Sequence, residues 1–444
     1  MRRVQAFLYP AYRRFVGRQY RFRRRVTGLG RAFIAGLLVT GVLGLDTRMN
    51  ALHQLFALLL GLSLTSLAWL PFFRGRFALH RELPPFCSAG VATAYRVRVT
   101  NLTSRWQKGL RLLEELADPR PDLAAFLAAR EPGEEERNPF DRMLGFHRFA
   151  WLTARSQAAA PVNVAIPPLA PGGEVWITVP FQPVRRGVAR FLGVTLARPD
   201  PLGLVQSLRF VPLPQTLTVL PRRRPLPSGL ALPPGGRRYQ RGGVSLAGSV
   251  GDAEEFHHLR EYRPGDSPRH IHWPSLAKLE KPMVRAFREE FFLRYGLVLD
   301  TFSPWADDRF EAAVSLAASL AATVESGDSL LDLLFVGRCG HRFTMGRGVG
   351  HAAHILEILA KVEPGAGESF HQLSALVLDH LATLSGLMLI LLAWDPPRRE
   401  LVARLRGRGV PVAVVLMAGI GEQTDPGPMA DDPGRFQIVE AARW

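Results

Sequence analysis

The residue types best suited to chemistry gather between residues 251 and 290 of the 444-residue chain. The candidate side chains of this stretch are Arg260, Arg269, Asp266 and the four histidines His257, His258, His270 and His272. Carboxylate and imidazole groups can act as general acid and base, and histidines two residues apart on a strand share a face on which a metal can bind. The spacing fixes no further metal ligand, so we expect no metal here.

The arginines and the aspartate of this stretch have two interpretations. Bidentate arginine–carboxylate pairs are suited to holding structure together, so we expect Arg260, Asp266 and Arg269 to form a network that locks the stretch onto the C-terminal domain. The alternative is an enzyme that uses Asp266, His270 or His272 as acid or base in hydrolase-like chemistry. Phosphate-binding loops, nucleophile elbows and zinc-binding helices are absent from the sequence, so we predict neither catalytic residues nor a cofactor.

The C-terminal part, residues 291–444, alternates between apolar runs and amphipathic segments. We expect strands at 295–300, 330–336, 387–394 and 410–417, and helices at 307–326, 351–362, 370–385 and 398–408. This alternation predicts a doubly wound α/β domain, whose ligands bind beyond the carboxyl ends of the strands. Asp300 and Asp395 follow two of the expected strands.

Residues 84–220 read as short strands punctuated by proline and glycine. The expected strands lie at 95–101, 175–179, 188–196 and 217–220, and they favour a β-sandwich-like domain. Residues 118–160 break the pattern and are interpreted as an insertion. Residues 221–250, rich in Pro, Gly and Arg, are interpreted as a linker to the 251–290 stretch.

The N-terminal end has the features of a membrane anchor. Residues 1–25 carry nine arginines, and two apolar segments follow at 26–45 and 51–73. At 1.5 Å per residue, 20 residues reach the ~30 Å thickness of a bilayer core, so the sequence predicts two transmembrane helices within residues 26–73. A signal peptide or a buried helical hairpin is the alternative.

Positive charge flanks the outer ends of both apolar segments, at residues 1–25 and again at Arg74, Arg76 and Arg81, whereas the turn between them is nearly neutral. The positive-inside rule therefore places both termini in the cytoplasm of a two-pass protein of the inner cell membrane. Residues 1–83 contain 14 arginines against two acidic residues, so most of the formal charge of +17 lies at this end. This distribution argues against nucleic-acid binding by the remaining body.

The 251–290 stretch resembles the signature of the domain-of-unknown-function-58 family. The matching residues are Leu259, Arg260, Tyr262, Gly265, Asp266, Arg269, Ile271, Trp273, Ala277 and Lys278, with upstream matches at Arg186, Gly187, Asp200, Pro201, Leu202, Gly203 and Leu204. The resemblance covers roughly residues 30–420. It implies a bacterial membrane protein with a β-sandwich-like part and a von Willebrand factor A-like α/β domain, and MoxR-type AAA+ ATPases as partners.

The resemblance also implies a place for a divalent ion, since the first strand of von Willebrand A domains ends in aspartate-x-serine-x-serine. Asp300 is present, but Phe302 and Pro304 occupy the serine positions, and Ser303 is out of register. Asp395 matches a later aspartate. Hard cations need several oxygen ligands, so Asp300, Ser303 and Asp395 form at most a remnant, and we expect no tightly bound ion.

Together these observations favour a non-enzymatic, membrane-anchored scaffold or adaptor. Its expected partners are the lipid bilayer and a protein, with a MoxR-type AAA+ ATPase implied by the resemblance. The alternatives are an enzyme built on the 251–290 stretch and a metal-dependent protein-binding domain.

Overall fold

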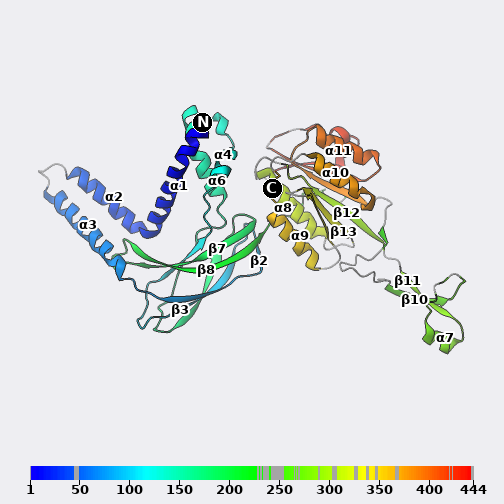
Figure 1. Cartoon of the computed structure of the whole chain (residues 1–444), viewed down its shortest axis with the longest axis horizontal. Coiled ribbons are helices and arrows are strands. Elements are labelled where there is room, and N and C mark those ends of the chain that lie inside the picture. The colour runs from blue at the N-terminus through cyan, green and yellow to red at the C-terminus, as the bar shows by residue number, and fades with distance from the viewer. Residues whose placement is uncertain are drawn as a thin grey trace. The chain divides into compact units, whose positions relative to one another are not determined.

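The structure is a computed structural model. It describes residues 2–44, 50–227, 230, 233, 240–241, 255–264, 266, 268, 271–288, 291–302, 308–324, 329–336, 340–345, 349–365, 370–419, 421–422 and 424–441. The chain divides into two compact units, Met1–Leu220 and Pro221–Trp444 (Figure 1).

Three helices open the first unit: α1 (Arg2–Arg25), α2 (Gly28–Leu43) and α3 (Asn50–Trp69), with the short 3-10 helix η1 (Leu70–Phe72) after them. Among the described residues, Ala51–Phe72 is the one helix that is long and apolar enough to cross a membrane. The second expected span, 26–45, forms the 16-residue helix α2, because Thr27 caps its first turn and the helix ends at Leu43.

Two sheets follow and enclose one hydrophobic core. The three-stranded sheet has the order β1-β3-β6, and the five-stranded sheet has the order β2-β8-β7-β4-β5. The strands are β1 (Phe77–Glu82), β2 (Phe86–Ser88), β3 (Thr93–Asn101), β4 (Arg111–Leu116), β5 (Asn163–Ala165), β6 (Glu174–Phe181), β7 (Gly187–Pro199) and β8 (Gln206–Leu220). Alternate residues of β3 point into the core, as period-two patterning requires.

Strand β8 is much longer than the expected strand at 217–220. Pro212 and Pro214 interrupt its apolar pattern, and proline is normally excluded from a strand interior. The pairing of β7 with β8 shifts register between Phe191 and Gly193, opposite these prolines, so a bulge accommodates them.

The segment expected to be an insertion contains helices α4 (Leu123–Ala128), α5 (Pro139–Leu144) and α6 (Phe146–Arg155). These helices pack on α1 around a small aromatic core formed by Tyr9, Phe126 and Phe149. The Tyr9 hydroxyl donates to the carbonyl of Pro121 at 2.8 Å. The basic N-terminal segment is therefore joined to residues more than a hundred positions away.

The second unit contains a seven-stranded sheet. Its main path runs β14-β13-β12-β15-β16-β17, with the short β9 (Gln240–Arg241) pairing with β12. Its strands are β12 (Phe291–Leu299), β13 (Ser329–Val336), β14 (Gly340–Met345), β15 (Gly386–Leu391), β16 (Val412–Ala418) and β17 (Phe436–Glu440). The pairings from β13 through β17 are parallel, and β14 is antiparallel to β13.

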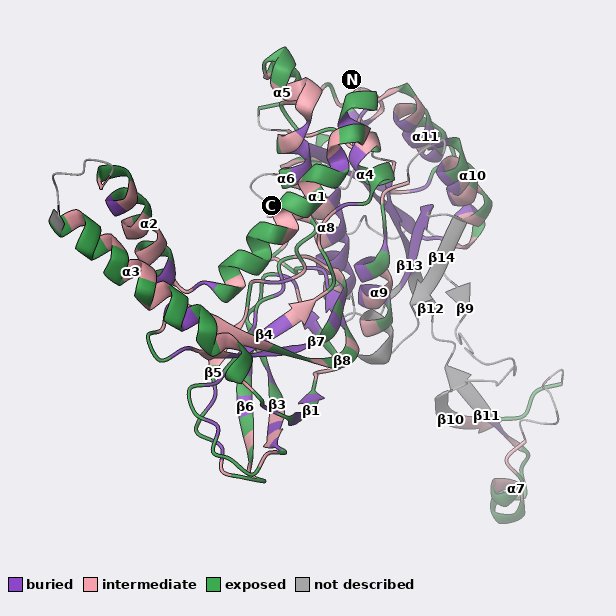
Figure 2. Ribbon diagram, turned by 60° about the vertical axis from the view of Figure 1, so that its left-hand side comes forward, coloured by how far each residue is buried: buried purple, intermediate pink, exposed green. Residues whose placement is uncertain are grey.

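Helices cover both faces of this sheet, and its central strands are buried throughout (Figure 2). Helices α8 (Asp308–Val324) and α9 (Val349–Lys361) contact each other, as do α10 (Phe370–His380) and α11 (Pro396–Gly407). Residues of α10 and α11 share a core with alternate residues of β15 and β16. This is the α/β arrangement that the alternating pattern predicts.

The signature stretch forms a separate hairpin in the second unit. Strands β10 (Glu255–Glu261) and β11 (Met283–Arg288) make a two-stranded antiparallel sheet, and the short helix α7 (Trp273–Leu279) lies in the connection between them. We call residues 255–288 the arm.

Candidate functional site

The upstream signature residues bracket strand β7. Gly187 opens the strand with φ of 125°, a backbone conformation that favours glycine. Asp200, Pro201 and Gly203 lie in the loop after it, residues 200–205, which we call the helix-docking loop because it contacts both α2 and α3.

Asp200 organises the helix-docking loop. Its buried carboxylate accepts hydrogen bonds from the backbone N–H groups of Leu202 at 3.1 Å and Val205 at 2.8 Å. It also accepts one from the hydroxyl of Ser66 in α3 at 2.8 Å. A buried carboxylate needs such partners, so Asp200 both shapes the loop and binds the end of α3.

The start of α2 is held by the same loop. The Thr27 backbone N–H donates to the Leu204 carbonyl at 3.0 Å, and the Thr27 hydroxyl donates to the Gly203 carbonyl at 2.6 Å. A Cβ atom on Gly30 would lie 2.0 Å from the Leu204 carbonyl oxygen, so only glycine permits this approach. The loop residues can be singled out from the sequence, but their contacts with α2 cannot, because Thr27 and Gly203 are 176 positions apart.

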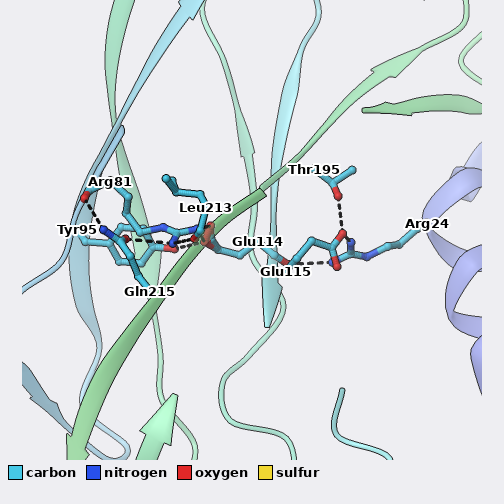
Figure 3. Close-up of polar contacts among 8 residues, drawn as sticks. All are labelled: Arg24, Arg81, Tyr95, Glu114, Glu115, Thr195, Leu213 and Gln215. Carbon is cyan, nitrogen blue, oxygen red and sulfur yellow. Dashed lines mark hydrogen bonds and ion pairs between the residues drawn. The ribbon is translucent and has the colours of Figure 1, made fainter. Parts of the chain in front are cut away.

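A second polar centre joins the sandwich interior to α1 through two adjacent residues of β4 (Figure 3). Glu114 points inward: Arg81 Nη2 donates to its two carboxylate oxygens at 2.6 and 3.0 Å, and the Tyr95 hydroxyl donates at 2.8 Å. Arg81 is completely buried and lies over the Phe191 ring. Burial raises the pKa of Glu114, and the Arg81 charge opposes that rise.

Glu115 points the other way and pairs with Arg24 near the end of α1. Arg24 also donates to the Glu114 carbonyl at 2.9 Å, and the Thr195 hydroxyl donates to Glu115. Neighbouring side chains of a strand point to opposite faces, so Glu114 reaches Arg81 in the sandwich interior and Glu115 reaches Arg24 in α1. The expectation that Arg81 belongs to the positive charges that flank the membrane is wrong, because Arg81 lies inside the sandwich.

The arm holds the main signature residues. Arg260 makes a bidentate pair with Asp266, with N–O distances of 2.6 and 2.7 Å, and the Arg263 backbone N–H donates to the same carboxylate at 2.9 Å. The Arg260 hydrogen bonds hold the pKa of Asp266 at about 2. Among the described residues the partners of Asp266 all lie within the arm, so the pair closes a loop there, whereas the expected network was to lock the stretch onto the C-terminal domain. Gly265, Arg269 and His270 lie outside the described residues.

The remaining signature residues shape or cover the arm. Ile271 bridges to the buried Val284, and His272 Nδ1 lies 2.7 Å from the Ser275 hydroxyl, at the start of α7. Two aromatic side chains are turned to solvent: Trp273 is 63% exposed and Tyr262 is 37% exposed.

Further signature positions also fall within the arm: Leu259 pairs with Arg285 across the hairpin, and Ala277 and Lys278 are exposed on α7. The side chains of His257 and His258 lie outside the described residues. The four histidines therefore have no described arrangement as a metal site, and in the described part of the chain no cluster of three metal-binding side chains occurs.

The expected metal remnant is occupied by a guanidinium group. The buried Asp300 carboxylate accepts from Arg398 Nε at 2.7 Å and from the backbone N–H groups of Phe302 and Leu392 at 3.0 Å each. Asp395 caps α11 and pairs with Arg398 at 2.6 Å. A fixed positive charge between the two aspartates opposes cation binding there. Ser303 lies outside the described residues, and the Arg398 contact was not foreseen because it is 98 positions from Asp300.

The family resemblance is confirmed for part of the chain. The family model described as "Protein of unknown function DUF58" matches residues 258–391, from the arm through β15. The uncharacterized protein YeaD of Bacillus subtilis (strain 168) is 28% identical over 183 residues, which make up 40% of this chain and 43% of that protein. The match therefore spans less than half the length of this relative.

Likenesses to solved structures are slight. Salmonella alpha-2-macroglobulin reacted with methylamine aligns with 44% of this chain and 9% of its own, at 19% identity and a TM-score of 0.17. The GH20 exo beta-N-acetylglucosaminidase from Vibrio harveyi in complex with N-acetylglucosamine aligns with 78% of this chain and 57% of its own, at 9% identity and a TM-score of 0.15. Such scores carry no argument about fold or function.

Proposed function

We propose that the protein is a membrane-anchored scaffold whose sandwich and second unit lie in the cytoplasm, and that it binds a protein partner through the arm. The observation that carries the anchoring is the helix Ala51–Phe72, whose apolar 18-residue window is only 6% buried. A core helix of a soluble protein buries its apolar face, whereas a lipid-facing helix exposes it within its own fold. Lipid is therefore the environment that suits α3.

Helix α2 is proposed as the second span. Its 16 residues reach ~24 Å, less than the ~30 Å of a bilayer core, and local thinning accommodates such a difference at modest cost. Helices α2 and α3 pack closely: a Cβ atom on Gly41 would lie 3.3 Å from the Phe56 ring, and one on Gly36 would lie 3.6 Å from Leu59. Small residues at such an interface are typical of helix pairs in membranes.

The proposed orientation places both termini in the cytoplasm. Its support is the arginine-rich α1 before α2, and Arg74 and Arg76 after α3, which flank the same end of the helix pair.

The second unit is proposed to be von Willebrand factor A-like. Its support is the strand order, with five parallel strands and the antiparallel β14 at one edge. A protein-binding domain of this kind would normally use a metal ion held by Asp300, but here Arg398 satisfies that carboxylate. Recognition of a partner must therefore use another surface, and this disfavours metal-dependent binding.

The arm offers that surface. Exposed aromatic side chains are typical anchors of protein interfaces, and Trp273 and Tyr262 project from a hairpin whose loop is fixed by Arg260 and Asp266. The enzyme alternative has less support, because both carboxylate oxygens of Asp266 are already engaged by Arg260. A MoxR-type AAA+ ATPase, implied by the family resemblance, is the partner we propose to test first.

The test is photo-crosslinking in native membranes with p-benzoylphenylalanine placed at Trp273, in the full chain. The matched control carries the same group at Lys108, an exposed residue of the sandwich. We expect a crosslinked partner protein from Trp273 and none from Lys108, with mass spectrometry identifying it. The absence of any specific adduct from Trp273, with or without ATP, contradicts the adaptor function.

A further inference from the structure

Helix α1 has two different faces. Gln5, Tyr9, Tyr12 and Val16 recur at helical spacing and pack against α4–α6, with the Gln5 amide donating to the Arg142 carbonyl at 2.8 Å. A second face of the helix carries three exposed aromatic side chains: Phe7 is 82% exposed, Phe22 is 47% exposed, and Phe15, at the edge beside Phe146 of α6, is 57% exposed. At 100° per residue these three phenylalanines form one stripe, and Figure 2 shows how much of α1 is exposed.

The charge on this exposed face is entirely positive. Five arginines share it with the phenylalanines: Arg3, Arg14, Arg18, Arg21 and Arg25. Residues 1–25 contain no acidic residue, and none of these arginines makes an ion pair with a residue that the structure describes. An aromatic stripe combined with unneutralised arginines is the composition of helices that lie in the interface of an anionic membrane.

The chain also brings α1 to the point where α2 begins. Only Val26 and Thr27 separate the two helices; Val26 bridges to Val205, and Thr27 is bound to the helix-docking loop. At its C-terminal end α1 is fixed to the sandwich through Arg24 and Glu115. If α2 enters the membrane, the C-terminal end of α1 must therefore lie at the membrane surface.

We propose that α1 lies on the anionic headgroup layer of the membrane that α2 and α3 enter, with Phe7, Phe15 and Phe22 inserted among the acyl chains and the arginines bound to lipid phosphates. The inference rests on the proposed membrane anchoring and deepens it. A protein partner that covers the same face is the competing occupant. It is less favoured, because a run of arginines without acidic residues matches a lipid phosphate layer along its whole length.

The experiment uses the full chain in nanodiscs that contain phosphatidylcholine and phosphatidylglycerol, with Cys87→Ala and Cys339→Ser to remove native thiols. A single cysteine carries an environment-sensitive fluorophore at one of three positions: Phe15→Cys in the stripe, Leu58→Cys in α3, or Lys108→Cys in the sandwich. Lipids with a quencher near the headgroup or deep in the acyl chain report the depth of each label.

We expect the label at Phe15 to be quenched mainly by the shallow quencher, the label at Leu58 mainly by the deep quencher, and the label at Lys108 by neither. Charge reversal with Arg14→Glu and Arg18→Glu should relieve quenching at Phe15 and leave Leu58 unchanged. Pure phosphatidylcholine should also weaken quenching at Phe15.

The outcomes separate the two proposals. Quenching at Leu58 without quenching at Phe15 overturns the placement of α1 and leaves the anchoring intact; the exposed stripe then belongs to a protein partner. Absence of quenching at Leu58 contradicts the anchoring itself. Quenching at Phe15 that charge reversal and lipid charge do not alter contradicts the role of the arginines.

Discussion

At the scale of single residues, the structure separates buried ion pairs that hold the fold from exposed ones that contribute little. Arg81 and Glu114 are both almost fully shielded from solvent, so losing either charge leaves the other uncompensated. Glu82 and Arg96 form a 3.0 Å pair on the surface of the same domain, where solvent screens the interaction. The two pairs therefore provide a matched comparison.

We predict that Glu114→Gln lowers the free energy of unfolding by about 3–5 kcal/mol, because a buried guanidinium loses its counter-charge. The control, Glu82→Gln, should cost ~0–1 kcal/mol. Chemical unfolding of the detergent-solubilised chain, followed by circular dichroism, measures both. Equal losses of unfolding free energy in the two variants would contradict the prediction that the buried Arg81–Glu114 pair stabilises the fold more than the exposed pair.

The Arg260–Asp266 pair has a defined pH dependence. Hydrogen bonding lowers the folded-state pKa of Asp266 to about 2, so the pair stabilises the folded state fully above the unfolded-state pKa of ~3.9. This stabilisation is lost as the pH falls through about 2. We predict that Arg260→Gln raises the Asp266 pKa toward ~3.9. Carbon-detected NMR titration of the carboxyl group provides the readout, and a pKa that stays near 2 in the variant would contradict the pairing.

The ion pair between Asp300 and Arg398 predicts that the protein does not bind divalent ions tightly. Titration of the full chain with Mg²⁺ or Mn²⁺ should give no binding at micromolar concentrations, because Arg398 already neutralises the carboxylate. Micromolar affinity that disappears in Asp300→Ala would overturn this conclusion and favour the alternative of a metal-dependent protein-binding domain.

At the scale of elements, the helix-docking loop joins the apolar helices to the sandwich, and Gly30 is its closest contact. We predict that Gly30→Ala destabilises the chain by about 1–3 kcal/mol, because the new methyl group meets the backbone carbonyl of Leu204. Gly28→Ala is the matched control: it lies two residues away with open space around it and should be neutral or slightly stabilising. Thermal unfolding in detergent measures both, and indistinguishable melting temperatures would mean that the loop does not constrain α2.

The elements also show what the sequence can and cannot predict. Strand and helix periodicity predicts β3, α8, β15 and α11 well, because each buries one face or all of its length in a single core. The long β8 was underestimated, since Pro212 and Pro214 hide a strand that tolerates them at a bulge. Glu114 and Glu115 carried no sequence signal, because their partners come from β1, β3 and α1, and only the folded sheet brings them together.

At the scale of the whole molecule, the chain combines an exposed apolar helix pair, a sandwich fixed to it by the helix-docking loop, and an α/β unit with an aromatic arm. The signature residues are divided among these parts: Asp200 and Gly203 position the helices, and Arg260 and Asp266 shape the arm. Each of these described contacts holds a loop or a helix in place. The proposed scaffold tethered to a membrane would use all of them.

The most direct test is cysteine accessibility in intact cells, with a membrane-impermeant maleimide and a chain free of its native thiols. We predict that a cysteine at Thr47, which lies between α2 and α3 in the sequence, is labelled from outside. A cysteine at Lys108, in the sandwich, should be labelled only after the inner membrane is permeabilised. Labelling of Lys108 in intact cells, or protection of Thr47 under conditions that label a known external site, would contradict the two-pass anchor and the cytoplasmic scaffold with it.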